Sequence, residues 1–486
     1  MSHDMYSSPL ASRYASDYML HLFSDDSRYQ TWRRLWTALA RAQCQLGLPI
    51  TEAQVAELEA HITDIDYDAA AQREREVRHD VMAHIYAYGK AAPSAAGILH
   101  LGATSCYVTD NADLILYRDG LVYLRAQLLT VLNNLAAFAK KYADTPALGY
   151  THYQPAQPVT VGKRAVLWMQ DFLADVEELD HVLSALRFLG CRGTTGTEAS
   201  FMDLFDGDEA KIDEMNRRIA AEFGFSACFP VCGQTYPRKT DSRILGCLIG
   251  IAQSAYRMAN DIRLLQHDRQ LEEPFEADQI GSSAMAYKRN PMRCERICSL
   301  SRYMIADAMN APMTASVQWL ERTLDDSANR RIAMPEGFLC IDAVLRLCQN
   351  VTAGLHVNEA IVDRTLREYL PFLATDRSVL NLPAIGKSMS FRLVGITPEG
   401  RRILRFDHDR TRRHSPIIDR MGEIYIVENK SLAAYLRQLE NMGEDADDYA
   451  SIWNYTHGET EPRFGLYVYP DFGFATTDRV SNLELE

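Results

Sequence analysis

Hydrophobic residues recur at alternating spacings of three and four in three long stretches of the chain. This is the pattern of a helix that packs lengthwise against a neighbour. The stretches cover residues 121–138, 165–186 and 244–265. Two further helices are expected around residues 295–309 and 328–356. The middle of the chain is therefore predicted to be a bundle of about five long helices.

Proline is expected to interrupt the last two helices. Pro312 follows the first of them, and Pro335 falls inside the second. A proline inside a helix removes one backbone hydrogen bond and its ring crowds the preceding turn. We therefore expect each helix to kink or restart at its proline.

The chain before the bundle is also expected to be helical. Residues 29–46 and 52–65 show a 3.6-residue period, which predicts a helical amino-terminal domain over residues 1–103. The bundle, over residues 104–356, is the predicted catalytic and oligomerisation domain. Its repeated heptads carry more apolar positions than one thin bundle can bury, which indicates that copies of the chain pack together.

Residues 357–486 form a third part, which changes character after residue 375. β-branched and aromatic residues cluster there in short runs, which predict strands rather than more bundle. The expected strands cover residues 389–395, 402–406, 423–427 and 464–469, with a short helix around 432–439. The predicted fold class is thus mainly α, with an atypical α+β carboxyl-terminal segment.

Charge and composition exclude several classes of function. The net charge of −14 would repel a polyphosphate backbone, so nucleic acid is not an expected partner. No signal-peptide pattern opens the chain, and the longest apolar run, residues 244–252, is too short to cross a membrane. The ten scattered cysteines fit free thiols in a reducing cytoplasm. Metalloprotease, P-loop and dinucleotide-binding motifs are absent from the sequence, and no metal site is expected.

The connections between the predicted helices are unusually rich in polar residues. Four of them, residues 102–106, 149–158, 193–200 and 279–292, are candidates for a functional site. In the last, Ser282 follows a glycine, and Lys288 and Asn290 come just behind. Such a loop can stabilise negative charge next to an activated serine, with Lys288 and Asn290 holding a carboxylate. The alternative is a mobile surface loop without chemistry.

Other polar positions are ambiguous when taken alone. An imidazole such as that of His152 or His79 can transfer protons near neutral pH, but it can equally be a structural histidine. Arg322, Ser327 and Arg331 would converge on a phosphate if a helix begins close to them. The alternative for these three residues is a capped, charge-balanced helix start.

Several motifs in order resemble one family. The loop Gly281-Ser-Ser-Ala-Met-Ala-Tyr-Lys-Arg-Asn-Pro resembles the signature of the fumarase/aspartase superfamily. The segments that begin at Ser8, Arg78, His100 and Trp319 narrow the resemblance to the adenylosuccinate lyase family. The resemblance runs from about residue 6 to residue 375 and does not extend over residues 376–486.

This resemblance implies a β-elimination that cleaves a C–N bond and releases fumarate. The expected substrates are adenylosuccinate, which gives AMP, and the succinylated aminoimidazole carboxamide ribotide of purine biosynthesis. The family forms homotetramers in which each active site takes loops from three subunits. No cofactor is expected, and the expected partner is a purine nucleotide.

The resemblance also assigns roles to residues of this chain. Ser282 is the expected general base, His152 the general acid and Glu295 the residue that orients His152. Lys288 and Asn290 are expected to hold the succinyl carboxylates, with Thr104, Ser105 and Thr151 as further carboxylate-side contacts. The residues expected to bind the nucleotide or support its pocket are Arg13, Tyr14, Arg78, His79, Gln234, Arg296, Arg322, Ser327 and Arg331.

Two departures from the family pattern keep alternatives open. Ala286 stands where the signature normally has proline, which is expected to loosen the loop, and the tail after residue 375 does not match. The alternatives are a sister enzyme such as argininosuccinate lyase, or an inactive nucleotide-binding scaffold that has kept the fold.

Overall fold

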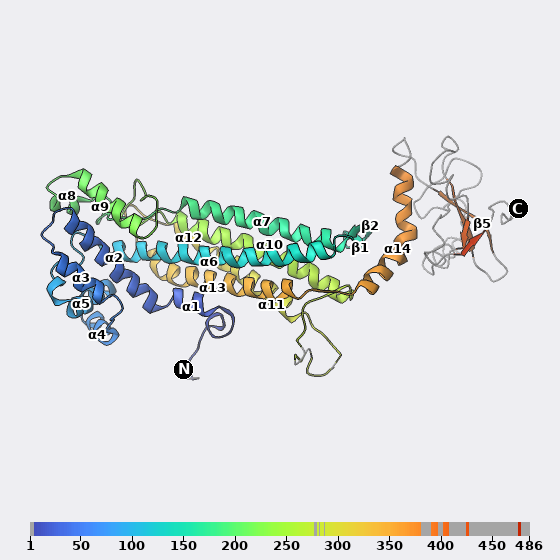
Figure 1. Cartoon of the computed structure of the whole chain (residues 1–486), viewed down its shortest axis with the longest axis horizontal. Coiled ribbons are helices and arrows are strands. Elements are labelled where there is room, and N and C mark those ends of the chain that lie inside the picture. Colours follow the sequence, from blue (N-terminus) through green and yellow to red (C-terminus); the bar gives the residue numbers. More distant parts are fainter. Residues whose placement is uncertain are drawn as a thin grey trace. The chain divides into compact units, whose positions relative to one another are not determined.

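The computed structural model describes residues 4–276, 279–280, 282–285 and 287–380, and four short strands beyond them (Figure 1). It divides into two compact units. Unit 1 holds residues 1–138 and 165–356, and unit 2 holds residues 139–164 and 357–486. The described chain is predominantly helical, which confirms the predicted fold class.

Several helices make up the amino-terminal part of unit 1. The π-helix η1 (Leu10–Tyr14) precedes α1 (Asp17–Leu22), α2 (Asp25–Gln45), α3 (Glu52–Ala60), α4 (Tyr67–Val77), α5 (Asp80–Ala91) and the 3₁₀ turn η2 (Pro93–Ala95). Local capping sets their starts. Ser24 accepts the amide of Ser27 at the start of α2, and Thr51 and Gln54 form a capping box on α3.

Five long helices build the bundle, as the hydrophobic spacing predicted. They are α6 (Ser105–Lys141), α7 (Val161–Ala185), α10 (Lys239–His267), α11 (Met292–Asp307) and α13 (Asp325–Ala353). Helix α10 packs against α11 and α13, and Trp168 of α7 donates its indole N–H to Asp261 of α10 at 2.7 Å. The shorter helices α8 (Ala199–Leu204), α9 (Glu209–Glu222) and α12 (Asn310–Ser316) lie between them in the sequence.

The predicted apolar seams of α6 and α10 form the core of the bundle. Leu124 and Leu128 of α6, and Leu248 and Ile251 of α10, are fully buried. Among the described residues, α6 is also the one helix that is long and apolar enough to cross a membrane. A core helix of a bundle has the same length and composition, and the buried seam of α6 is typical of one.

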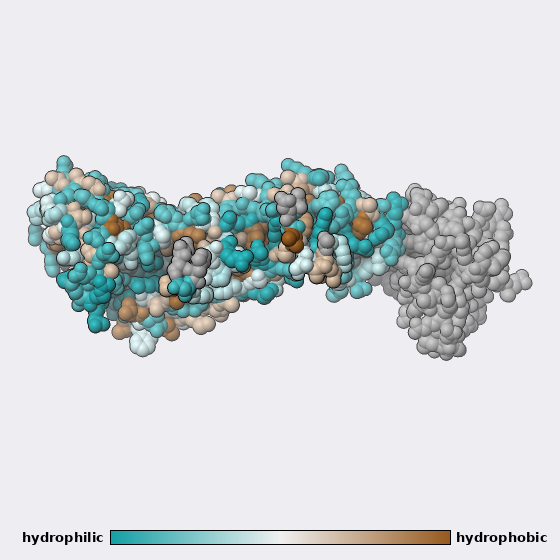
Figure 2. All heavy atoms as spheres, turned by 90° about the horizontal axis from the view of Figure 1, so that it is seen from below, coloured by the Kyte–Doolittle hydropathy of each residue, from teal (hydrophilic) through white to brown (hydrophobic). Residues whose placement is uncertain are grey.

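Helix α7 has apolar residues on more than one side. Phe172 is fully buried, whereas Val166, Leu167 and Leu173 are exposed. The face of the molecule shown in Figure 2 likewise has hydrophobic residues among the hydrophilic ones over the helical part.

The predicted restart at Pro335 is wrong. Helix α13 continues through this residue, whereas α11 ends before Pro312 and α12 begins at Asn310. Because α13 packs against both α10 and α11, the neighbouring helices support the turn whose backbone bond is lost. That bond is the one the carbonyl oxygen of Arg331 would accept from residue 335 in an uninterrupted helix.

In unit 2, the segment expected as a loop around residue 152 is a hairpin. Strand β1 (Pro146–Thr151) pairs antiparallel with β2 (Gln154–Thr160), and α14 (Glu359–Leu380) packs against both strands. The expectation of a loop was wrong because prolines at 155 and 158 are tolerated in this two-stranded edge pairing.

The remaining strands are short. Strands β3 (Leu271–Glu272) and β4 (His356–Val357) have two residues each. Beyond α14, a four-stranded antiparallel sheet has the order β5 (Ser390–Ile396), β6 (Arg402–Asp407), β7 (Ile424–Ile426) and β8 (Ala475–Thr477). The first three overlap segments that the sequence marks as strands. The expected strand at 464–469 and the expected helix at 432–439 lie outside the described residues.

Candidate active site

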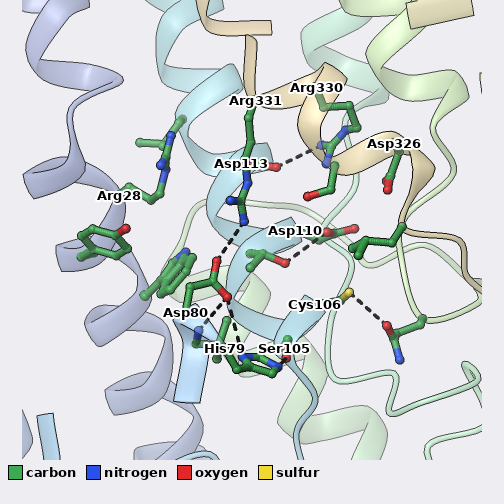
Figure 3. Close-up of a pocket in the computed structure, with 18 of the residues that line it drawn as sticks. Arg28, His79, Asp80, Ser105, Cys106, Asp110, Asp113, Asp326, Arg330 and Arg331 are labelled. Carbon is green, nitrogen blue, oxygen red and sulfur yellow. Dashed lines mark hydrogen bonds and ion pairs between the residues drawn. The ribbon is translucent and has the colours of Figure 1, made fainter. Parts of the chain in front are cut away.

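A cavity of about 540 Å³ in unit 1 brings seven of the seventeen predicted site residues together (Figure 3). Its walls come from α2, the α4–α5 turn, the start of α6, the segment at Gln234 and the start of α13. The predicted residues that line it are Arg78, His79, Ser105, Gln234, Arg322, Ser327 and Arg331. Among the described residues, no group of three or more His, Cys, Asp or Glu side chains is arranged to hold a metal ion.

The α4–α5 turn delivers three polar side chains to one wall. Arg78 ends α4 in the left-handed conformation, at φ 54°, and His79 caps the start of α5. The His79 Nδ1 atom accepts the amide of Met82 at 3.4 Å, so the ring proton belongs on Nε2, which lies 3.3 Å from Ser105 Oγ. Asp80 accepts a hydrogen bond from Arg331 at 2.9 Å.

The start of α6 forms the adjoining wall. Gly102 has φ +74°, and a Cβ atom there would lie 2.7 Å from a methyl carbon of Leu204, so the turn into the helix requires glycine. Cys106, the second residue of α6, donates its thiol to Gln234 Oε1 at 3.3 Å. Burial and the nearby Asp110 raise the pKa of Cys106 to about 12, so the thiol stays protonated and is a poor nucleophile.

A buried chain of ion pairs leads from α6 to Arg322. Arg238 contacts Asp110 through two nitrogens, at 2.8 and 3.2 Å, and donates its Nε to Asp326 at 2.5 Å. Asp326 in turn accepts from Arg322 at 2.9 Å. Burial alone would raise the pKa of Asp326, but Arg238 and Arg322 hold it below its ordinary value.

A second buried group surrounds Arg330, which Figure 3 shows beside this chain. Arg330 donates to Asp241 at 2.6 Å, to Asp113 at 3.0 Å and to the hydroxyl of Tyr236. Burial raises the pKa of Asp113, while the positive charge of Arg330 opposes the rise. The cavity floor is therefore a fully paired set of charges that can hold exposed guanidinium groups in fixed directions.

Another wall is aromatic. Phe23, Tyr29 and Trp32 line the cavity, together with Arg28. Tyr29 stacks on His84 at a centroid distance of 3.7 Å, and burial and Arg33 lower the pKa of His84 to about 4. A cavity lined by both arginines and aromatic rings suits a flat ring that carries an anionic group.

Arg13, Tyr14 and Arg296 form a separate cluster. The guanidinium group of Arg296 lies 5.5 Å from the centre of the Tyr14 ring, and the Tyr14 carbonyl accepts from Arg346 at 3.0 Å. Arg346 follows Pro335, the last residue of α13 that lines the cavity, by 11 residues, which is about 16 Å along a helix. These residues therefore do not join the cavity within one copy of the chain.

The loop before α11 carries the predicted general base. Ser282 Oγ accepts the backbone amides of Ala284 at 3.3 Å and Met285 at 3.1 Å. Amide donors of this kind stabilise a serine oxygen that gains negative charge. Lys288 is exposed and Asn290 is partly exposed. Gly281 and Ala286 lie outside the described residues, so the expected effect of Ala286 on the loop stays a prediction.

The other predicted residues occupy helix and strand ends. Glu295 is exposed on the first turn of α11, and Thr104 directly precedes α6 without lining the cavity. Thr151 ends β1, and His152 and Tyr153 form the two-residue turn of the hairpin, with φ values of 52° and 56°. Such a turn favours Asn and Gly, so His-Tyr in left-handed conformations is a strained choice of the kind found at functional sites.

Sequence reasoning missed eight charged residues that line the cavity. They are Arg28, Glu74, Asp80, Asp110, Asp113, Arg238, Asp326 and Arg330. Asp80 directly follows Arg78 and His79, so the same sequence motif could have indicated it. The i, i+3 spacing of Asp110 and Asp113 on α6 could have indicated a polar face on an otherwise apolar helix. Nothing local marks Arg238 or Arg330, because their partners are distant in the sequence.

Comparison with known proteins agrees with the helical bundle and the cavity. A lyase family model matches residues 12–305. The chain is 52% identical to adenylosuccinate lyase of Schizosaccharomyces pombe over 386 residues, which cover 79% of this chain and 80% of that protein. The adenylosuccinate lyase of Saccharomyces cerevisiae is 49% identical, with 78% and 79% covered.

Solved structures share the fold. A 3-carboxy-cis,cis-muconate lactonizing enzyme from Pseudomonas putida superposes with a TM-score of 0.67 at 24% identity, covering 77% of this chain and 84% of that one. A fumarate lyase from Mesorhizobium has a TM-score of 0.66 at 24% identity, with 77% and 83% covered. Bundle, cavity and family model together define a lyase of this helical class. Within that class, the chain belongs to the adenylosuccinate lyase family.

Proposed function

We propose that this chain cleaves adenylosuccinate into AMP and fumarate, and the succinylated aminoimidazole carboxamide ribotide into its free amide and fumarate. The observation that carries this proposal is the cavity, where Arg322, Ser327 and Arg331 meet at the start of α13 and which also has an aromatic wall. A helix start with two arginines suits a phosphate, and the aromatic wall suits a purine. Argininosuccinate has neither group.

The reaction is a β-elimination. In the proposed mechanism, Ser282 removes the proton β to the departing nitrogen, and His152 protonates that nitrogen as the C–N bond breaks. Negative charge develops on the succinyl group in between, and Lys288 and Asn290 stabilise it, with Thr104, Ser105 and Thr151 as further contacts. Glu295 orients His152. The amides that Ser282 already accepts lower the cost of its ionised form.

Each active site is proposed to need more than one copy of the chain. Arg13, Tyr14 and Arg296 cluster near Arg346, about 16 Å of helix beyond the cavity residue Pro335, although the family uses all of them at one site. The exposed apolar residues of α7 give copies a surface on which to pack. We propose a homotetramer in the cytoplasm, with residues 104–356 as the catalytic and oligomerisation domain.

Turnover assays test this function. Purified protein is incubated with adenylosuccinate and separately with argininosuccinate, and fumarate formation is followed by its ultraviolet absorbance. Fumarate from adenylosuccinate alone is the expected result. Turnover of argininosuccinate alone would replace the proposal with the sister enzyme, and tight AMP binding without turnover of either would indicate an inactive nucleotide-binding scaffold.

A further inference from the structure

We propose that Asp326 and Arg238 are positioning residues that aim Arg322 at the phosphate group of the substrate. This inference rests on the proposed function and extends it to residues that act through Arg322. Their side chains are the links between Arg322, which reaches the cavity, and Asp110 on α6, in the middle of the fold.

The links are among the most enclosed charges in the described chain. Asp326 is fully buried, and the side chains of Arg238 and Asp110 are 2% and 3% exposed. Removing four charges from water is costly, and an isolated pair would be replaced by apolar residues at little loss of stability. A series of ion pairs that ends at a cavity can do more than stabilise the fold. Each guanidinium plane fixes the direction of the next group, so the series can orient the last side chain.

The contacts of Arg322 show how these ion pairs orient its guanidinium group. Its Nη1 atom donates to Asp326 at 2.9 Å and also to the carbonyl oxygen of Thr323. Both Nη1 hydrogens are therefore directed inward. The Nε and Nη2 hydrogens point along the other edge of the same rigid plane, which is the edge that binds an oxyanion with two parallel hydrogen bonds.

The same series of ion pairs also positions a second predicted substrate-binding residue, Gln234. Asp110, which holds Arg238, accepts the backbone amide of Tyr236 at 3.2 Å. Tyr236 follows Gln234 by two residues, and Gln234 spans from Cys106 to the carbonyl of Thr194 at 3.3 and 3.1 Å. One buried carboxylate thus fixes both the segment of Gln234 and, through Arg238 and Asp326, the guanidinium of Arg322.

Charge and position make opposite predictions for Asp326→Asn. The substitution removes one negative charge behind Arg322, so by charge alone a phosphate would bind more tightly. By position, Arg322 loses the strong acceptor that holds its plane, and phosphate binding weakens. We expect about a tenfold rise in the dissociation constant of AMP and in the KM of adenylosuccinate. The kcat should stay within about twofold, because the phosphate contact is the same in the ground and transition states.

Isothermal titration calorimetry with AMP and adenosine, on the full-length protein, is the test. A positioning role predicts weaker AMP binding and unchanged adenosine binding, whereas a merely structural defect weakens both ligands alike. Asp325→Asn is the matched control, because Asp325 is its exposed neighbour in the first turn of α13 and removes the same helix-terminal charge. It should leave both affinities unchanged.

Arg238→Lys serves as the second variant, and as the replacement if Asp326→Asn fails to fold. It keeps the charge but loses the planar fork, so AMP binding should weaken in the same way. Tighter AMP binding by Asp326→Asn, or equal losses for AMP and adenosine in the folded variants, would overturn the proposal. So would a wild-type protein that does not bind AMP. Absence of adenylosuccinate turnover by wild-type protein that binds AMP would contradict the proposed function alone.

Discussion

Single side chains in this protein owe their chemistry to their surroundings. The thiol of Cys106 faces the cavity, yet burial raises its pKa to about 12 and removes it as a nucleophile. His84 lies behind the aromatic wall, and a pKa lowered by burial to about 4 keeps it neutral. Ser282, in contrast, is partly exposed and already accepts two amides. Proton transfer is therefore expected from the loop and hairpin, not from the buried groups.

Ser282→Ala and His152→Asn are each expected to abolish turnover while AMP binding stays near the wild-type value. Both side chains are proposed to act in proton transfer and not in nucleotide binding. Asparagine is chosen at 152 because it tolerates the left-handed backbone of the turn. Steady-state assays of fumarate release measure the loss, and Ser283→Ala is the matched control, expected to retain activity. Near-normal rates for either variant would remove its assigned role.

Asp175 makes a pH-dependent contribution to stability. Its side chain is buried between α7 and α10, one of its oxygens has no partner among the described residues, and burial raises its pKa to about 6. A raised carboxyl pKa means that the folded state binds the proton more tightly than the unfolded state. Stability is therefore lost as pH rises from about 4, the unfolded value, to about 6.

Asp175→Asn is accordingly expected to raise the thermal midpoint at pH 8 and to reduce the decline between pH 4 and pH 6. Thermal unfolding followed by circular dichroism over that range measures both effects. Glu177→Gln, on the same helix but exposed, is the control and should not change the pH profile of the midpoint. A wild-type midpoint that stays flat across this range would contradict the argument.

At the scale of elements, close approach of helices decides which glycines are required. A Cβ atom at Gly120 of α6 would lie 2.8 Å from the ring of Phe338 on α13, so the two helices can approach only because the side chain is missing. At Gly246 of α10, the same atom would meet nothing within 4 Å.

The two glycines should respond to alanine in opposite directions. Gly120→Ala is expected to lower the free energy of unfolding by about 1–3 kcal/mol, because the packed ring must move. Gly246→Ala is expected to raise it by about 0.5–1 kcal/mol through helix propensity. Urea denaturation of both variants gives the comparison, and destabilisation by Gly246→Ala would show that another surface covers this part of α10.

At the scale of the whole molecule, the predicted site residues fall into several groups. The cavity holds seven of them, and the cluster around Tyr14 lies far along α13. The hairpin with His152 belongs to a different compact unit from the cavity. A site assembled from several copies gives all of these groups one purpose.

Mixing experiments test that assembly. Ser282→Ala and His152→Asn proteins, inactive alone, are dissociated together and allowed to reassemble. If Ser282 and His152 of one site come from different copies, random exchange restores about a quarter of wild-type activity, because each intact site needs one unmutated residue from each of two subunits. Each variant taken through the same treatment alone is the control. No recovery, despite mixed assemblies seen by native mass spectrometry, would rule out sites shared in this way.

Local patterns in the sequence were enough to predict the helices of the bundle. Spacings of three and four located α6, α7 and α10, because a buried seam must repeat with the helix period. Through the family that they resemble, the motifs around Ser282, His152 and Arg322 imply an elimination on a nucleotide, and the roles of these residues stay predictions. Only the tertiary structure could reveal the chain from Asp110 through Arg238 and Asp326 to Arg322. Its members are separated by up to 216 positions, and charge pairing across such distances leaves no periodic trace in the sequence.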